Sequence, residues 1–251
     1  MNFSHEYTNS KITDMSKNLL GLSILIAVIF TACQSNETGN SKDVAQDQIY
    51  RKYEVSIDEA TASATASAVF RFAGENGTTL TLTSPAKITA NGVELIQGTL
   101  IFGGAYYRNE QPLGCPANKV ELVYADKDGI VLTELFEAGS AAFQQQQDTF
   151  LLGKTLSVPF SFSGGDPVDN FEIIIRDKEN RSLSFYAESN SDKFFQIPGT
   201  ATDTLAKGEL ELQIISHKRK NLDDHSTLGG TADFSCNFKP VKVLAVKDEV
   251  N

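Results

Sequence analysis

Tryptophan is absent from the 251-residue sequence, and histidine, cysteine and methionine are scarce, at three, three and two residues. So few histidines and cysteines leave little material for a metal site, since both are preferred ligands of zinc and similar ions. No HExxH, P-loop, nucleophile-elbow or dinucleotide-binding glycine pattern is present either. We therefore predict no catalytic residues, no metal and no cofactor. The missing tryptophan also removes the flat aromatic platform on which sugar-binding sites often rely.

Positive charge is in short supply as well. The 22 lysines and arginines are outnumbered by 32 aspartates and glutamates, which gives a formal net charge of -10. Nucleic-acid binding depends on clustered basic side chains that neutralise phosphates. The composition therefore excludes a nucleic-acid partner, and it also argues against electrostatic docking on anionic lipid.

Long apolar runs are missing, with the exception of residues 19–30 near the amino terminus. This run is shorter than the about 20 residues that a membrane-spanning helix needs. Lys17 precedes it and two small residues follow it, which is typical of a signal peptide. We therefore expect a signal peptide over residues 1–32. Because the acidic residues before Met15 do not suit the charged region of such a peptide, Met15 is the better start.

The end of this segment carries a recognisable pattern, formed by Phe30, Thr31, Ala32 and Cys33. It resembles the lipobox of bacterial lipoproteins, in which a large apolar residue and two small ones precede an invariant cysteine. The resemblance implies cleavage before Cys33 and attachment of several acyl chains such as palmitate, which together make a stable membrane anchor. By analogy with enteric bacteria, the absence of aspartate after Cys33 implies the outer membrane. Two alternatives stay open: an ordinary secretory signal cleaved near Ala32, and an uncleaved anchor helix.

The remainder of the sequence divides into a polar segment and two stretches of predicted strands. Residues 33–48 hold almost no apolar side chains after the cysteine, which predicts a flexible tether. Alternating apolar and polar residues then indicate short strands over 49–143 and again over 150–248, with a glutamine-rich linker over 144–149. The strand count of the second stretch is that of an immunoglobulin-like sandwich. We therefore predict an all-β fold, with two tandem immunoglobulin-like β-sandwich domains after the signal peptide and tether.

Two short sequence patterns predict particular elements of this β fold. Asn91-Gly92 lies between short apolar arms and predicts a two-residue hairpin, because both turn positions need positive φ. In residues 60–68, alanine alternates with threonine and serine, which predicts a strand with one smooth face and one hydroxyl face. A Ser/Ala-rich loop is the alternative. The stretch 66–95 resembles the opening of tandem β-sandwich lipoproteins from Bacteroidota envelopes. Those proteins are largely of unassigned function, so the resemblance implies architecture and little chemistry.

Two cysteines remain in the predicted mature chain besides Cys33. Cys115 and Cys236 could form a disulfide that clamps the two halves together, since an envelope compartment permits one. No spacing rule brings the two positions within bonding range. Cys236 shares a predicted strand face with apolar residues, which is instead typical of a buried small side chain.

The candidate ligand contacts are three tyrosines and one basic run, namely Tyr106, Tyr107, Tyr186, His217, Lys218, Arg219 and Lys220. The tyrosines could act as small aromatic platforms, or they could be half-buried strand residues. The basic run is the only concentrated positive charge, and it could meet an acidic glycan or the carboxylates of a partner. A solvated hairpin end is the alternative interpretation of this run.

Two further segments share some features with ion sites. His225 with Asp223 and Asp224 matches no zinc spacing, and its surroundings indicate a hairpin loop. Residues 125–129 begin like a calcium loop but lack its later ligands. We therefore predict a plain hairpin turn there and no metal at either place.

These features favour a non-catalytic binding or interaction module held on the cell envelope. Its expected partners are the membrane, through the lipid at Cys33, and an envelope protein or a glycan. A structural component of an envelope complex is the first alternative, and a hydrolase of envelope or extracellular polymers is the second. A largest pocket lined by two carboxylates, one of them buried, would favour the hydrolase, and an exposed apolar patch above a few hundred Å² would favour a protein partner. A shallow groove with exposed tyrosines would favour a ligand-binding module.

Overall fold

The computed structural model describes residues 38–99, 104–144, 149–188, 194–222 and 228–247. Residues 36–251 form one compact unit, separate from residues 1–35. The predicted signal peptide, the lipobox and Cys33 therefore lie outside the described residues. Nearly all regular structure in the described part is β-strand, which confirms the predicted all-β class. None of the described helices is long and apolar enough to cross a membrane.

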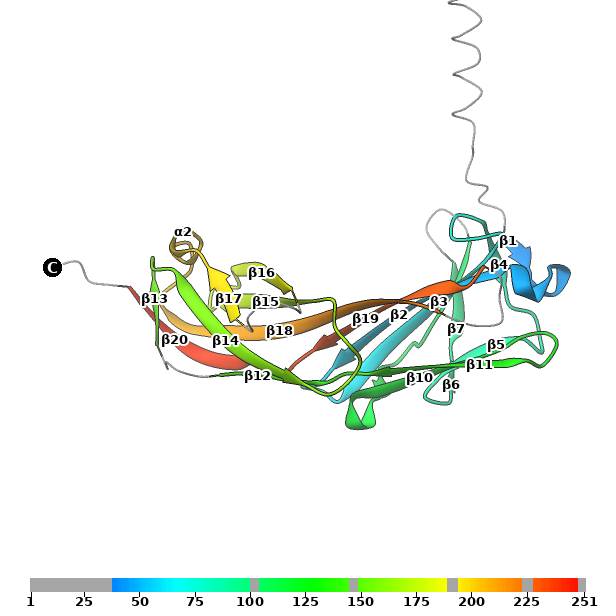
Figure 1. Ribbon diagram of the computed structural model, residues 1–251, viewed down its shortest axis with the longest axis horizontal. Coiled ribbons are helices and arrows are strands. Elements are labelled where there is room, and N and C mark those ends of the chain that lie inside the picture. The colour runs from blue at the N-terminus through cyan, green and yellow to red at the C-terminus, as the bar shows by residue number, and fades with distance from the viewer. Residues whose placement is uncertain (1–37, 100–103, 145–148, 189–193, 223–227, 248–251) are drawn as a thin grey trace, which may run out of the picture. The chain divides into compact units, whose positions relative to one another are not determined.

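The largest sheet has 13 strands and draws on both halves of the sequence (Figure 1). Its main path, in spatial order, is β1 (Thr38–Asn40), β4 (Thr78–Thr81), β3 (Ser63–Phe72), β2 (Ile49–Asp58), β19 (Gly230–Asn237), β18 (Gly208–Asn221), β15 (Asn170–Asp177) and β16 (Ser182–Glu188). The remaining strands lie beside this path: β7 (Ile96–Thr99), β8 (Ala105–Arg108), β9 (Leu113–Gly114), β13 (Thr149–Leu152) and β20 (Val241–Lys247). We call this the long sheet.

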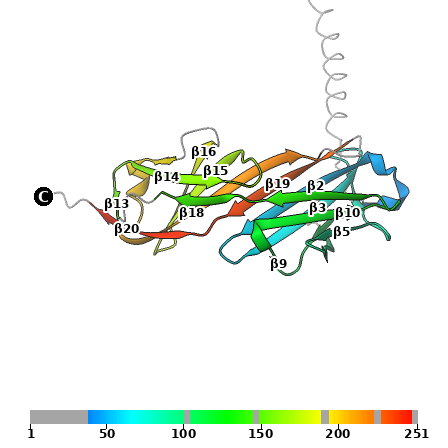
Figure 2. The ribbon, with the colours of Figure 1, turned by 60° about the horizontal axis from the view of Figure 1, so that its bottom comes forward.

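The two halves of the sequence meet within the long sheet (Figures 1 and 2). β19 pairs with β2 in parallel, in register from Gly230 beside Arg51 to Asn237 beside Asp58. Parallel neighbours need a long connection, and here most of the chain lies between them. The two predicted sandwich domains therefore share one sheet. Most of the predicted linker, residues 145–148, lies outside the described residues.

Two smaller sheets cover the long sheet on one face. The first is β11 (Val131–Glu137), β10 (Lys119–Ala125), β5 (Lys87–Ala90) and β6 (Val93–Glu94), and the second is β12 (Ser140–Phe143), β14 (Leu156–Ser163) and β17 (Phe194–Ile197). Aromatic pairs join the layers. Phe70 of β3 lies 4.7 Å from Tyr124 of β10 between ring centroids, and Phe171 of β15 lies 4.9 Å from Phe160 of β14. The fold is thus a pair of sandwiches on a common sheet.

The alternating segment of residues 60–68 forms the start of β3, which confirms the strand interpretation from Ser63 onward. Ala64, Ala66 and Ala68 are buried on the covered face of the sheet. Small side chains suit this face because the rings of Phe70 and Tyr107 pack beside them, 5.8 Å apart. Thr65 and Ser67 point to the opposite face by strand alternation.

The predicted hairpins are present. Asn91 and Gly92 have φ values of 47° and 78° and connect β5 to β6, as a two-residue turn requires. Asp126 opens the predicted turn of residues 125–129, and its Oδ1 accepts the N–H groups of Asp128 and Ile130, each at 2.8 Å. The plain hairpin turn is thereby confirmed, because this carboxylate is occupied by its own turn.

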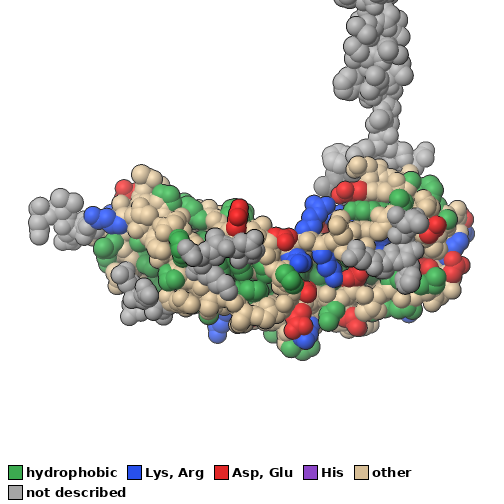
Figure 3. Space-filling view, viewed as in Figure 1, with side chains coloured by type: hydrophobic (Ala, Val, Ile, Leu, Met, Phe, Trp, Pro, Cys, Tyr) green, Lys and Arg blue, Asp and Glu red, His purple; other side chains and the backbone are tan. Residues whose placement is uncertain are grey.

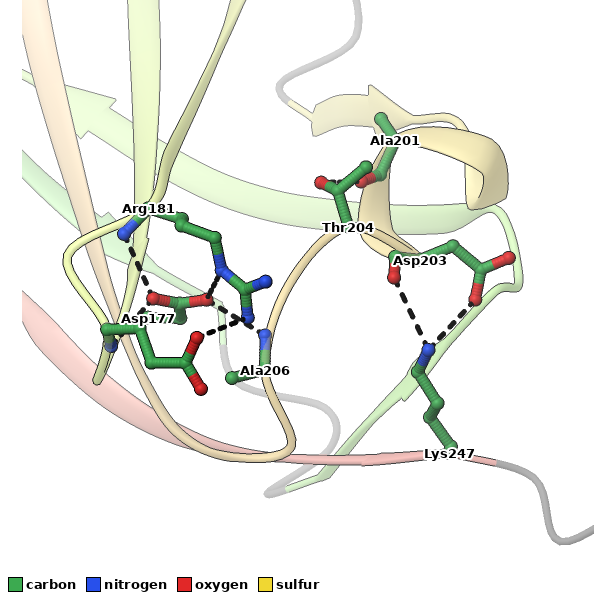
Figure 4. A network of polar contacts seen from close by, with 8 residues as sticks. Asp177, Arg181, Ala201, Asp203, Thr204, Ala206 and Lys247 are labelled. Carbon is green, nitrogen blue, oxygen red and sulfur yellow. Dashed lines mark hydrogen bonds and ion pairs between the residues drawn. The ribbon is translucent and has the colours of Figure 1, made fainter.

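A second aspartate turn connects β15 to β16 (Figure 4). The carboxylate of Asp177 accepts hydrogen bonds from the main-chain N–H groups of Glu179, Arg181 and Ala206 and from Nε of Arg181, all within 3.0 Å. Burial alone would raise the pKa of this carboxyl, but the four donors outweigh it and lower the pKa to about 2. The loop after β17, which includes α2 (Gly199–Thr202), is tied to the sheet through Ala206.

The predicted flexible tether is wrong for residues 38–48. β1 pairs in parallel with β4, and two 3-10 turns follow, η1 (Ser41–Asp43) and η2 (Gln46–Gln48). Ser41 is fully buried, and its hydroxyl accepts the N–H of Thr83 at 3.2 Å. The side-chain amide of Gln46 donates to the main-chain oxygen of Ser41 at 2.9 Å.

Hydrogen bonds between polar side chains and the main chain thus order this segment, and a composition poor in apolar residues does not reveal them. The rest of the predicted tether, residues 33–37, lies outside the described residues.

Candidate binding groove

A groove of about 840 Å³ lies on the outer face of the long sheet, the face turned away from the two covering sheets. Six neighbouring strands line it, in the order β8, β3, β2, β19, β18 and β15. Five spacings of about 4.8 Å make it roughly 24 Å wide across the strands. Figure 3 shows basic and acidic side chains side by side over the region where β2, β3 and β19 meet. Both halves of the sequence therefore contribute to one surface.

The floor of the groove is made of small hydroxyl side chains. Ser235, Ser56 and Thr65 stand beside one another on β19, β2 and β3, and Ser67 lies one step further along β3. Among the described residues, the hydroxyls of Ser235, Thr65 and Ser67 have no hydrogen-bond partner. They are free to donate to a ligand and to accept from it.

One wall of the groove is a network of ions centred on Arg219. Its main-chain N–H donates to Oδ2 of Asp169 at 2.7 Å. Its guanidinium lies 3.6 Å from the carboxylate of Glu75 and 3.8 Å from that of Asp233. Lys52 lies 3.9 Å from the same Asp233 carboxylate. The wall therefore carries both signs of charge, and its basic and acidic side chains lie beside one another.

His217 lies beside Arg219 on the groove. Its Nε2 is 3.2 Å from Oε2 of Glu172, and its ring centroid is 6.5 Å from that of Tyr186. Tyr186 is 69 % exposed, which makes it an accessible aromatic face next to the groove.

The predicted basic run lies within a strand, which corrects its interpretation as a hairpin end, and its side chains lie on two different faces of the sheet. β18 continues through these residues to Asn221, so their side chains alternate between the two faces of the sheet. His217 and Arg219 face the groove, whereas Lys218 and Lys220 face the covering sheet. Lys220 Nζ bonds Oε2 of Glu134 at 2.7 Å, beneath the first covering sheet. Only two of the four residues of the basic run therefore face the groove.

The opposite end of the groove is formed by Arg108 and Tyr106 on β8. The Arg108 guanidinium lies 5.5 Å above the Tyr106 ring and has no acidic partner among the described residues. The other side of this ring lies on Gly98 of β7, where a Cβ would come within 2.5 Å of it. A second hollow of about 310 Å³ continues the groove here, with Val69 at its side. Tyr106 is thus an edge of the site and is covered on both faces.

Tyr107, the third tyrosine among the candidate contacts, lies in the core. It is 5 % exposed, its hydroxyl accepts the N–H of Leu82 at 2.6 Å, and burial raises its pKa. It points away from the groove by strand alternation, so it is not available to a ligand there.

Cys115 and Cys236 are both free and buried in the structure. The thiol of Cys115 donates to the main-chain oxygen of Lys119 at 3.3 Å. Cys236 is fully buried on the covered face, where burial raises the pKa of its thiol to about 12. Its surroundings are those of a small apolar side chain, the alternative to a disulfide.

The remaining candidates are an ion site and a pair of catalytic carboxylates. His225, Asp223 and Asp224 lie outside the described residues, and the described part of the chain holds no cluster of three metal-ligating side chains. The hydrolase hypothesis expected a buried carboxylate in the largest pocket. The four acidic residues that line the groove are all exposed or half-buried: Glu54, Glu110, Asp169 and Asp233.

The hydroxyl floor was not among the predicted site residues. Its signal in the sequence is the alternation of alanine with threonine and serine in 60–68, which we used only to predict a strand. The partners Ser56 and Ser235 have no such signal, because only the register across β2 and β19 places them beside Thr65.

No family model matches this chain, and no curated protein matches it. Among solved structures it is similar to a tetra-tandem repeat in the extending region of a large adhesion protein, with 16 % identity, a TM-score of 0.25, and coverage of 75 % of this chain and 49 % of that one. It is also similar to SGBP-B of the Bacteroides ovatus mixed-linkage glucan utilization locus in complex with a mixed-linkage heptasaccharide, with 10 % identity, a TM-score of 0.17, and coverage of 76 % and 61 %. The chain spans about half of the first protein and less than two thirds of the second. At these TM-scores neither similarity supports an argument about function.

Proposed function

We propose that this chain is a membrane-anchored envelope lipoprotein and a non-catalytic binding module, and that its groove holds an uncharged glycan chain. The observation that carries the proposal is the groove itself, with its row of hydroxyls on three adjacent strands. Among the described residues, the hydroxyls of Ser235, Thr65 and Ser67 in this floor have no partner, whereas that of Ser56 accepts from Asn237 Nδ2 at 3.4 Å. A glycan presents many hydroxyls of its own, and it can exchange hydrogen bonds with such a floor in both directions.

The charge of the groove favours an uncharged ligand. Arg219 and His217 already lie beside carboxylates, and Lys52 lies 3.1 Å from Glu54. The net charge of the chain is -10, so the long-range field repels an acidic polymer. Besides the guanidinium of Arg108, for which the described residues supply no carboxylate, hydrogen bonds to hydroxyls are therefore the main contacts that remain available to a ligand.

Binding to glycans tests the groove directly. Residues 36–251 are run through affinity gels containing neutral polysaccharides (α-glucan, β-glucan, mannan) or polygalacturonate, and affinity for retained polymers is measured by calorimetry. Ser67→Phe fills the floor and is expected to weaken binding at least about tenfold. The matched control Thr133→Phe adds the same ring to an exposed strand of a covering sheet, and it should leave binding unchanged.

Three outcomes would overturn the glycan proposal: no retention in any gel, retention only by polygalacturonate, or equal weakening by both variants. Hydrolysis of a retained polymer would contradict a non-catalytic binding module and would favour the alternative function of a hydrolase.

The lipid anchor is supported by the pattern Phe30, Thr31, Ala32 and Cys33 after an apolar run. Labelled palmitate fed to cells that express the full chain is expected to enter the protein. Cys33→Ser should abolish the labelling and release the protein from the membrane fraction. Labelling that survives Cys33→Ser, or no labelling at all, would refute the anchor while leaving the groove untouched.

One observation favours the alternative of an assembly component. Ile130, Val131 and Leu135, at and near the outer strand β11 of the first covering sheet, are 49 %, 58 % and 49 % exposed. Exposed apolar groups in one region are typical of protein contacts. A pull-down from detergent-solubilised envelope should then recover a partner that Leu135→Lys loses, and Ser67→Phe should retain it.

A further inference from the structure

An apolar crevice of about 370 Å³ lies in the second half of the chain, away from the groove. It opens between β14 of the covering sheet and β18 and β20 of the long sheet. Val158, Leu212 and Val243 form its buried wall.

The crevice has a structural cause. β12 pairs with β14 only over residues 160–163 and ends at Phe143. On this side residues 156–158 of β14 have no strand partner among the described residues. Among the described residues the covering sheet is thus one strand narrower here, and Val241 of β20 is 36 % exposed.

The size of the crevice suits a ligand better than a packing defect. Protein cores are close-packed, with few voids larger than a water molecule. An apolar cavity of about 150 Å³ holds a benzene, so by proportion 370 Å³ has room for roughly 15 carbon atoms. Filling it would remove apolar wall from water, which stabilises a complex by about 25 cal/mol for each Å².

The described side chains of the lining favour an uncharged ligand. None of the described side chains that line the crevice is ionisable. The polar ones are Gln144, Thr155 and Ser157, which are all exposed and can exchange hydrogen bonds with a head group. A charged head group would lose hydration there without gaining a countercharge. We propose that the crevice is a second binding site, and that it takes an uncharged molecule with a single aliphatic chain.

The test uses residues 36–251 and the neutral fluorophore N-phenyl-1-naphthylamine. The fluorescence should rise saturably to one equivalent, and 1-dodecanol should displace the probe at concentrations about tenfold lower than dodecanoate or dodecylamine. Val241→Phe, which places a ring in the crevice from a 36 % exposed position, should weaken probe binding at least about tenfold. Leu244→Phe places the same ring on the opposite face of β20, and binding should stay within about twofold of the original.

A third variant keeps the test decisive if Val241→Phe does not fold. Thr155→Arg adds a positive charge to an exposed position at the crevice, so dodecanoate should now displace the probe better than 1-dodecanol does. The proposal is overturned if the probe does not bind saturably or if the two phenylalanine variants weaken binding equally. It is also overturned if 1-dodecanol, dodecanoate and dodecylamine displace the probe equally well from both the original protein and Thr155→Arg.

Discussion

Replacing Phe136 by alanine tests whether the shared sheet makes the two halves of the chain fold as one. Phe136 belongs to β11 in the first half and is fully buried. Its ring lies 5.6 Å from that of Phe234, and Lys220 Nζ lies 4.7 Å above its centroid, both contributed by the second half. The substitution therefore removes contacts that connect the halves.

The expected loss follows from these contacts. Truncating a buried phenylalanine costs about 3–5 kcal/mol, and loss of a partly buried cation–π contact adds about 1 kcal/mol. The free energy of unfolding should therefore fall by about 4–6 kcal/mol. For a chain of this length each kcal/mol corresponds to roughly 2–4 °C, so the melting temperature should drop by roughly 8–24 °C.

The assay is urea unfolding of residues 36–251, followed by circular dichroism and by hydrogen exchange resolved into peptides. Because β19 pairs with β2 along its whole length, we expect one transition, in which peptides from β10 and β14 lose protection at the same urea concentration. Phe136→Leu fills most of the space and should cost only about 2 kcal/mol. If β14 stayed protected while β10 exchanged, the halves would unfold separately and the reasoning would be wrong.

Three further predictions concern single sites. The folded-state pKa of Asp177 is lowered to about 2, below the unfolded value of about 3.9, so its contribution to stability is complete above about pH 4 and is lost as the pH falls toward 2. Asp177→Asn should therefore lower the melting temperature at pH 7 and make the melting temperature depend less on pH between about 4 and 2. An acid profile identical to that of the original protein would contradict this. Gly98→Ala brings a Cβ within 2.5 Å of the Tyr106 ring and should lower the melting temperature by several degrees, a loss that Tyr106→Ala in the same chain should largely reverse. Cys115 and Cys236 are buried with raised pKa values, so at pH 8 neither thiol should react with Ellman's reagent until urea is added; rapid reaction of the native protein would refute their burial.

Local features of the fold were predictable because neighbouring residues decide them. Asn91-Gly92 specifies its turn through the positive φ that both residues tolerate, and the alternation in 60–68 specifies which side chains share a face. The sequence did not predict the ordered structure of residues 38–48, because no apolar run holds that segment in place. Instead, the Ser41 hydroxyl accepts a main-chain N–H, and the Gln46 side chain donates to a main-chain oxygen.

The candidate groove was predictable only in fragments. His217 and Arg219 were identified as possible contacts from their charge, yet Lys218 and Lys220 carry the same charge and face the other way. Strand alternation separates them, and this required knowing that β18 continues to Asn221 instead of turning. The position of a charged residue in the sequence does not show which face of a sheet its side chain lies on until the extent of the strand is known.

By itself, the sequence determined the class of the fold, the faces of most strands and the turns between neighbouring strands, since these depend on contacts among residues close along the chain. Only the tertiary structure decided that β19 lies beside β2, that two halves share one sheet, and that Ser56, Thr65 and Ser235 form one floor. Pairing between distant strands depends on main-chain hydrogen bonds that nearly every residue can make. The side-chain pattern of a strand therefore does not identify the strand that pairs with it.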